Sequence, residues 1–153
     1  MQPNTFMISK NIAGVAAGAT IKVLAKTDGS SVIFDPLSVR STEPSLELRL
    51  YENPTFSDVG LTTLTPINKN RLSSDVSDTL VYDDPTTPTT PETIGGVMLY
   101  EGIAVAEKHA GASAETRTSF VLQGNQYYLY TIKNGSNSAA TITIDFIWKE
   151  IKK

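Results

Sequence analysis

The sequence predicts an all-β protein, an antiparallel two-sheet β-sandwich of the jelly-roll type with about eight strands. Three observations lead to this fold class. Apolar residues rarely recur at the three-and-four spacing of a helix. Several short segments instead alternate apolar and polar residues, or are rich in β-branched and aromatic residues. Gly, Pro, Asn, Ser and Thr separate these segments at short intervals, as turns require.

The clearest strand of the first half is residues 45–51, SLELRLY. Its three leucines occupy alternate positions and share one face, because side chains alternate along a strand. Glu47, Arg49 and Tyr51 lie on the other face, so this strand is predicted to be half-buried. The further strands predicted before the last thirty residues are 20–25, 31–34, 79–82, 97–106 and 118–122.

The chain ends with two strong strand patterns. Residues 126–133, QYYLYTIK, form a β-branched and aromatic run that fits a strand covered on both faces. Residues 141–149, TITIDFIWK, alternate, with Trp148 on the apolar face and hence in the core. The linker NGSNSAA contains Asn134-Gly135, which suits the positive-φ positions of a hairpin turn. We therefore expect the two strands to pair antiparallel as a hairpin.

Residues 1–153 are expected to form a single domain. Residues 1–10 are either an ordered strand or a flexible N-terminal arm. Residues 83–93 contain three prolines at three-residue spacing, which predicts an extended Pro/Thr-rich surface loop. The alanine-rich residues 101–115 fit one helical turn or the end of a strand. The terminal KEIKK is expected to be a solvated, charged tail.

Composition excludes several classes of function. The net charge is −3 and the pI about 5.1, which argues against nucleic acid as a partner. Cysteine is absent, so disulfides and thiolate chemistry are excluded. The mildly apolar residues 12–17 are too short for a secretory signal or a membrane span, and we expect a protein made in the cytoplasm and not bound to a membrane.

No catalytic or cofactor-binding pattern stands out. The single histidine, His109, lies in EKHAG and is expected to be an ordinary surface residue. The pair Asp83-Asp84 lacks the spacing of a calcium loop, and the other carboxylates are scattered. The sequence therefore predicts no enzyme, no metal and no cofactor.

Two stretches resemble small virion proteins of tailed bacteriophages. LYENPT at residues 50–55 is followed by TPINKNRLSSD at residues 65–75, and the chain closes with FVLQGNQYYLYTIKNGSNSAATITIDFIWKE. In that family a strand runs into an E-N-P-T turn, then comes an I-N-x-N-R-x-S-S stretch, and a tyrosine-rich strand and a tryptophan-bearing strand end the domain. The quoted stretches together comprise 48 of the 153 residues.

This resemblance implies a head decoration, cement or head-fibre protein, commonly trimeric, whose partner is the major capsid protein or another virion protein. The residues it singles out would structure loops or make contacts between proteins. They are Pro54, Asn68, Lys69, Asn70, Arg71, Tyr128 and Tyr130. Two other functions stay open: a receptor- or carbohydrate-binding module that uses Tyr82 and the Pro/Thr loop, and a tail or neck component of the virion.

Overall fold

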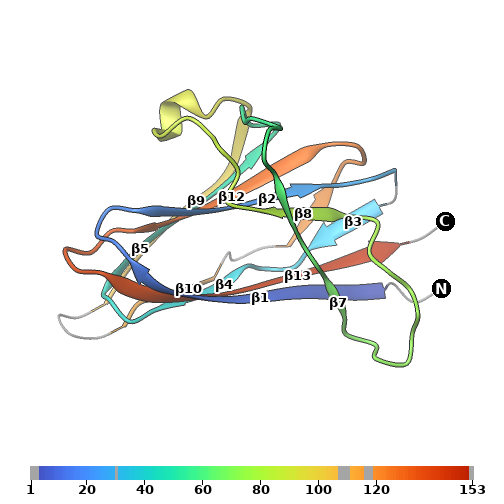
Figure 1. Ribbon diagram of the computed structural model, residues 1–153, viewed down its shortest axis with the longest axis horizontal. Coiled ribbons are helices and arrows are strands. Elements are labelled where there is room, and N and C mark those ends of the chain that lie inside the picture. The colour runs from blue at the N-terminus through green and yellow to red at the C-terminus, as the bar shows by residue number, and fades with distance from the viewer. Residues whose placement is uncertain (1–3, 30, 107–110, 116–118, 152–153) are drawn as a thin grey trace.

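The computed structural model describes residues 4–29, 31–106, 111–115 and 119–151 and is built from two antiparallel β-sheets packed face to face (Figure 1). His109 and residues 107–110 lie outside the described residues. The strands are β1 (Asn4–Val15), β2 (Thr20–Lys26), β3 (Ser31–Phe34), β4 (Ser38–Ser41), β5 (Ser45–Glu52), β6 (Thr62–Leu64), β7 (Ile67–Asn68), β8 (Leu80–Asp83), β9 (Val97–Val105), β10 (Ser113–Glu115), β11 (Phe120–Leu122), β12 (Tyr127–Asn134) and β13 (Ala140–Ile151). A short 3-10 helix, η1, spans Pro91–Thr93.

Sheet A is ordered β10-β4-β13-β1-β7, with β3 and β11 continuing it beside the second half of β13. Sheet B is ordered β6-β8-β2-β12-β5-β9. The predicted β-sandwich is therefore confirmed. All eight predicted strands are present, and the structure adds β1, β4, β6, β7 and β10. Four of the five missed strands have only two to four residues, too few for alternation to show.

The core lies between the two sheets and is rich in aromatic side chains. Phe34 and Phe146 of sheet A have ring centroids 4.8 Å apart, and Tyr130 of sheet B packs edge-on against Phe146 at 5.4 Å. Trp148 is fully buried beside Phe146, as its alternate position predicted. Edge-to-face pairs of this kind add stability beyond the burial of their area.

The predicted hairpin of the last two strands is wrong. β12 pairs with β2 and β5 in sheet B, whereas β13 pairs with β1, β3 and β4 in sheet A. The linker crosses between the sheets, and neither Asn134 nor Gly135 has a positive φ. The reason is burial: β12 is covered on both faces and β13 carries a continuous apolar face, so each strand is the centre of its own sheet.

Residues 4–10 form the first part of β1, so they are not a flexible arm. β1 pairs with β13 from Asn4↔Glu150 to Ile12↔Ile142, and β7 pairs with its outer edge. Phe6 and Ile8 are buried in the core. The sequence left a strand and an arm both open, because Ser9, Lys10 and Asn11 interrupt the apolar pattern where the sheet surface turns to solvent.

Candidate functional site

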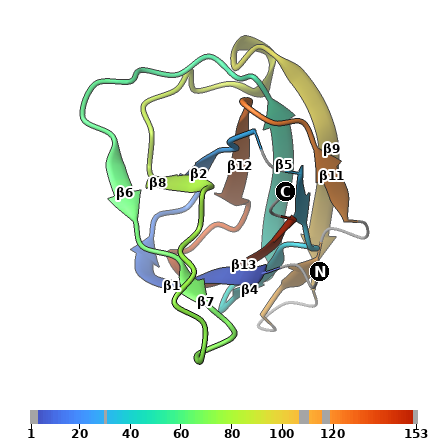
Figure 2. The same cartoon turned by 90° about the vertical axis from the view of Figure 1, so that its right-hand side faces the viewer.

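Two loop segments cover the outer face of sheet B. Residues 53–61 and the Pro/Thr-rich residues 84–96 rise above β12 and β5, as the upper part of Figure 1 and the end-on view in Figure 2 show. They are joined by backbone hydrogen bonds from Thr55 N to Ile94 O, 2.6 Å, and from Ser57 N to Thr86 O, 2.9 Å. We call residues 84–96 the flap.

The flap is anchored by a second apolar cluster on the outer face of the sheet. Ile94 is buried against Leu24, Tyr51 and Leu129, with Phe56 and Tyr82 packed around them. Tyr51 was expected to face outward, and it does, but the flap covers it to 3% exposure. The Pro/Thr segment is thus a loop, as predicted, whose inner side is a packed cover.

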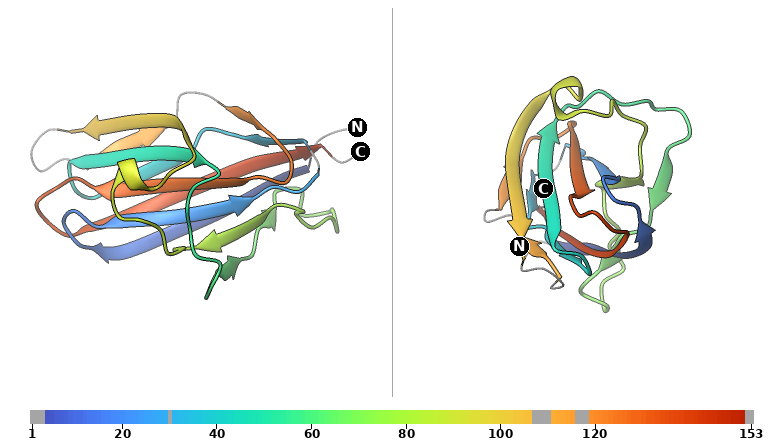
Figure 3. Two further views of the ribbon diagram at one scale, coloured as in Figure 1. Left: turned by 90° about the horizontal axis from the view of Figure 1, so that it is seen from above. Right: turned by 90° about the vertical axis from the view of Figure 1, so that its left-hand side faces the viewer.

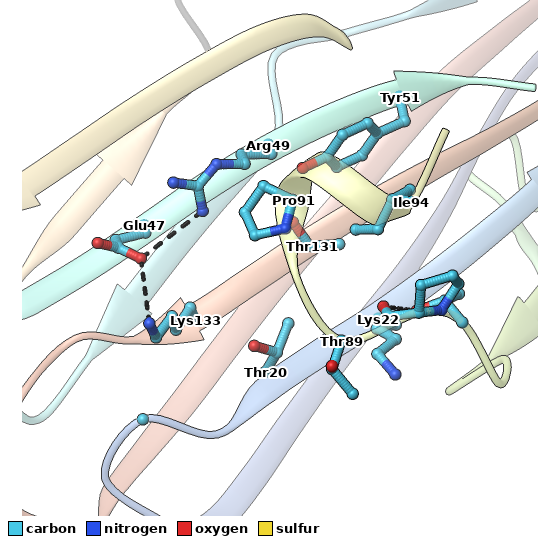
Figure 4. A pocket seen from close by; sticks show the side chains of 13 residues that line it. Thr20, Lys22, Glu47, Arg49, Tyr51, Thr89, Pro91, Ile94, Thr131 and Lys133 are labelled. Carbon is cyan, nitrogen blue, oxygen red and sulfur yellow. Dashed lines mark hydrogen bonds and ion pairs between the residues drawn. The ribbon is translucent and has the colours of Figure 1, made fainter. Parts of the chain in front are cut away.

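Between the flap and the sheet lies a pocket of about 260 Å³ (Figure 4). Its floor is formed by β2, β12 and β5, which contribute Lys22, Thr131 and Arg49. Pro88 and Pro91 of the flap form the opposite wall. A second hollow of about 270 Å³ adjoins it and shares Arg49, Tyr51 and Pro91.

Charged side chains dominate the floor of the pocket. Glu47 lies 3.6 Å from Arg49 Nη1 and 3.8 Å from Lys133 Nζ (Figure 4). Arg49 Nε donates a 2.7 Å hydrogen bond to Glu101. Burial lowers the pKa of Arg49, but the hydrogen bond and charge of Glu101 and the charge of Glu47 outweigh it and raise the pKa. Lys22 has no ion pair with any described residue.

The hydroxyl of Tyr51 is buried and has no hydrogen-bond partner among the described residues. Burial raises the pKa of this phenol, and the positive charge of Arg49 partly offsets the increase. A buried hydroxyl without a partner is unfavourable by about 1–3 kcal/mol. It is therefore an unused polar group at the junction of the two hollows.

Four of the residues singled out by sequence lie at the end of β7 and in the loop that follows it: Asn68, Lys69, Asn70 and Arg71. Asn68 Nδ2 donates to Asp75 O at 3.1 Å, and its Oδ1 accepts from Asn70 N at 2.9 Å. Asn70 Oδ1 accepts from Leu72 N, so both asparagines organise this loop. Lys69 and Arg71 are exposed and form no ion pair within the described part of the chain.

Pro54 is buried and lies far from that loop. It follows Asn53, whose positive φ of 50° turns the chain out of β5 into the segment beneath the flap. Asn53 also accepts a hydrogen bond from Tyr127 N at its Oδ1, 3.2 Å. Pro54 thus belongs to the packed cover of sheet B.

Tyr128 and Tyr130 were candidates for contacts with other proteins, and the structure places both in the core instead. Tyr128 OH donates to Glu52 at 2.8 Å, and burial together with Glu52 raises its pKa to about 12. Burial alone raises the pKa of Tyr130, whose hydroxyl has no partner among the described residues. β12 is covered on both faces, which explains why its tyrosines do not reach the surface.

Sequence reasoning missed Glu150, which was expected in a solvated tail. Glu150 is fully buried and accepts hydrogen bonds from Ser77, Asp78, Thr79 and Trp148. The alternation of buried residues from Ile142 to Trp148 continues for two more residues to Glu150. This alternation is the sequence signal that could have predicted the burial of Glu150.

In the part of the chain that the structure describes, no three His, Cys, Asp or Glu side chains gather so that they could hold a metal ion. Asp83 forms an ion pair with Lys10. Among the described residues, no helix reaches the length and apolar character that a membrane crossing demands.

Similarity of this chain to known proteins is weak. No protein-family model matches the chain, and no curated protein matches its sequence. One solved structure, titled as the structure of infectious bursal disease virus Gx strain, is similar at 12% identity with a TM-score of 0.22. The match covers 100% of this chain and 43% of that one, so the chain spans less than half of its length. A likeness at this level carries no argument about function.

Proposed function

We propose that the chain is a non-catalytic structural protein of a tailed-phage virion, which binds the assembled capsid and stabilises or decorates it. The resemblance in residues 50–55, 65–75 and 120–150 supports the virion role. The observation that carries a binding role is the exposed edge of β9. The partner is then the major capsid protein or another virion protein, and the protein itself acts as a homo-oligomer, with a trimer favoured.

β9 is the last strand of sheet B and pairs only with β5 along its length. Within the described residues no strand pairs with its other edge, so its outward N–H and C=O groups are open to a partner strand. Of the eleven large apolar side chains that are exposed among the described residues, four are on β9: Val97, Met98, Ile103 and Val105.

β9 carries few of the features that protect strand edges, although its pairing with β5 shifts register between Leu50 and Tyr51, as at a β-bulge. It has no Lys and no Pro, and its single charge, Glu101, is neutralised by Arg49. Unprotected apolar edges of this length normally pair or aggregate. β11 lies on the same side of the sandwich as β9 (Figures 2 and 3), and its Val121 is 78% exposed. This side is therefore the surface that we assign to protein contacts.

Many weak contacts suffice for such a role. Repeated copies on a symmetric shell gain avidity without a large interface for each copy. Selective binding to the assembled shell stabilises it by mass action. Neither effect requires chemistry at the site.

Copy number tests the virion role. Quantitative mass spectrometry of purified virions of the parent phage should find tens to hundreds of copies relative to the major capsid protein. A handful of copies would move the protein to the tail or neck, and complete absence would overturn the virion role.

The β9 edge is tested by Ile103→Lys, with Val59→Lys as the matched control. Both residues are well exposed, at 62% and 80%, so neither change should unfold the sandwich. We expect Ile103→Lys to reduce binding to shells that lack the protein, or self-association in analytical ultracentrifugation, while Val59→Lys leaves both unchanged. Equal behaviour of the two variants in both measurements would rule out β9 as the contact strand.

A further inference from the structure

The pocket beneath the flap has more hydrogen-bond donors than acceptors. Lys22, Arg49 and Lys133 bring three positive charges to it, and Glu47 brings one negative charge. Thr20, Thr89 and Thr131 add hydroxyl groups. Glu101, which is hydrogen-bonded to Arg49, offsets one of these charges, and the balance at the pocket remains positive in a protein whose overall charge is −3. A local field of opposite sign to the whole chain attracts anions.

Most of these donors are unused within the described residues. The distances of 3.6 Å and 3.8 Å from Glu47 to Arg49 and Lys133 are too long for hydrogen bonds. Arg49 uses its Nε on Glu101, which leaves its terminal nitrogens free to bind an oxyanion in a forked geometry. The ammonium of Lys22 has neither an ion pair nor a hydrogen bond there.

Tyr51 supplies an independent sign of a ligand. Its side chain is 3% exposed, and its hydroxyl points toward Pro91 and Arg49 without a partner (Figure 4). A buried hydroxyl of this kind is satisfied when a ligand oxygen reaches it.

The walls and the size limit what the ligand can be. Pro88, Pro91 and Ile94 present apolar surface opposite the charged floor, which suits the C–H face of a carbon ring. A volume of about 260 Å³ lies just below the usual range of ligand pockets, roughly 300–1,000 Å³. One ring with its substituents fits, and a long chain does not.

From this lining we infer that the pocket binds an acidic monosaccharide, a hydroxylated ring that carries one carboxylate or phosphate group. Arg49 and Lys133 take the oxyanion, Lys22 of β2 adds positive charge at the other end of the floor, and the threonine hydroxyls and Tyr51 take the ring hydroxyls. The pocket and the contact strand are different elements, because the pocket floor is formed by β2, β12 and β5, although β9 borders this floor where Ile103 pairs with Glu47.

The test is an NMR titration of the ¹⁵N-labelled full chain with three probes: glucuronate, glucose 6-phosphate and neutral glucose. We expect saturable shifts at pocket residues with at least one acidic sugar, and binding of glucose weaker by about tenfold or more, since an oxyanion on an arginine contributes at least one charged hydrogen bond. A preference for glucuronate identifies a carboxylate ligand, and a preference for glucose 6-phosphate a phosphate. No saturable shifts at the pocket with either acid would overturn the inference.

Two variants locate the binding. Lys22→Gln should weaken binding of the preferred acid by about tenfold, since it removes a cation and leaves no partner behind. Lys69→Gln, the matched control on the loop after β7, should leave it unchanged. Tyr51→Phe should weaken binding of the acid and of glucose alike. If the Lys22→Gln variant has an NMR spectrum of an intact fold and binds the preferred acid as tightly as the wild type does, the inference of an acidic-sugar site is also overturned.

Discussion

The indole Nε1 of Trp148 donates a hydrogen bond of 3.1 Å to Oε1 of Glu150, two residues farther along the same face of β13. Ser77 Oγ donates to the same carboxylate oxygen at 2.5 Å, and the amides of Asp78 and Thr79 donate at 3.0 Å and 2.9 Å. A buried charge thus ties the segment before β8 to the central strand of sheet A. Four donors make its burial tolerable.

Glu150→Gln should destabilise the protein by about 2–4 kcal/mol. The neutral amide accepts weaker hydrogen bonds than the carboxylate, and its NH2 group faces hydrogen-bond donors with no acceptor to bind. Chemical denaturation with urea measures the loss. Asp58→Asn, at an exposed position, is the control and should change little. A loss of under about 0.5 kcal/mol for Glu150→Gln would contradict the structural role of this carboxylate.

The same residue predicts a pH dependence. Burial opposes ionisation of Glu150 most strongly, but the hydrogen bonds from Ser77, Asp78, Thr79 and Trp148 outweigh it and lower the pKa below its ordinary 4.5. The folded state then binds fewer protons than the unfolded state, so the stabilisation is complete above pH 4.5 and is lost as the pH falls through the folded pKa. Urea denaturation between pH 7 and pH 3 should show the difference between wild type and Glu150→Gln shrinking below about pH 4.5. A constant difference would argue against a lowered pKa.

The two core tyrosines of β12 should respond in opposite ways to loss of the hydroxyl. Tyr128→Phe removes the bond to Glu52 and the 3.1 Å bond from Gln123 N, so it should destabilise by about 2 kcal/mol. Tyr130→Phe removes a hydroxyl without a partner among the described residues and should leave stability unchanged or raise it by up to about 1 kcal/mol. Thermal and urea denaturation of the pair compare them directly, and a larger loss for Tyr130→Phe would be the contrary result.

Asn134 is predicted to hold the crossing between the sheets. Its Nδ2 donates to Val15 O at 3.0 Å and to Ser138 O at 2.9 Å, and its Oδ1 accepts from Ser136 N at 3.0 Å. Asn134→Ala leaves these backbone groups without partners in a buried place and should cost about 2–3 kcal/mol of folding free energy. Asn137→Ala, exposed in the same linker, is the control and should be neutral.

Deletion of residues 1–10 should prevent stable folding. It removes seven residues of β1 and the buried Phe6 and Ile8, and it exposes the edge of β13. Circular dichroism and a urea titration should show no cooperative transition. Deletion of residues 1–3 keeps all of β1 and serves as the control. A folded, cooperative protein after the longer deletion would restore the view of this segment as an arm.

The candidate site could be predicted only in part. The three prolines of residues 83–93 marked a surface loop, and that part is correct. Nothing in the sequence showed that Ile94 would be buried against Leu24 and Leu129, because those contacts join three distant segments. Lys22, Arg49 and Lys133 lie on three different strands, and only the order β2-β12-β5 makes them neighbours.

The sequence by itself determined the fold class, the eight main strands and the burial of Trp148. These follow from alternation and residue preference, which are local properties of a strand and leave a trace in consecutive residues. Tertiary structure decided the rest. The partner of each strand depends on which buried face it must cover, so β12 and β13 became the centres of two sheets despite a linker typical of a hairpin. The burial of Glu150, Tyr51 and Tyr130 was decided in the same way, because the segments that cover them come from elsewhere in the chain.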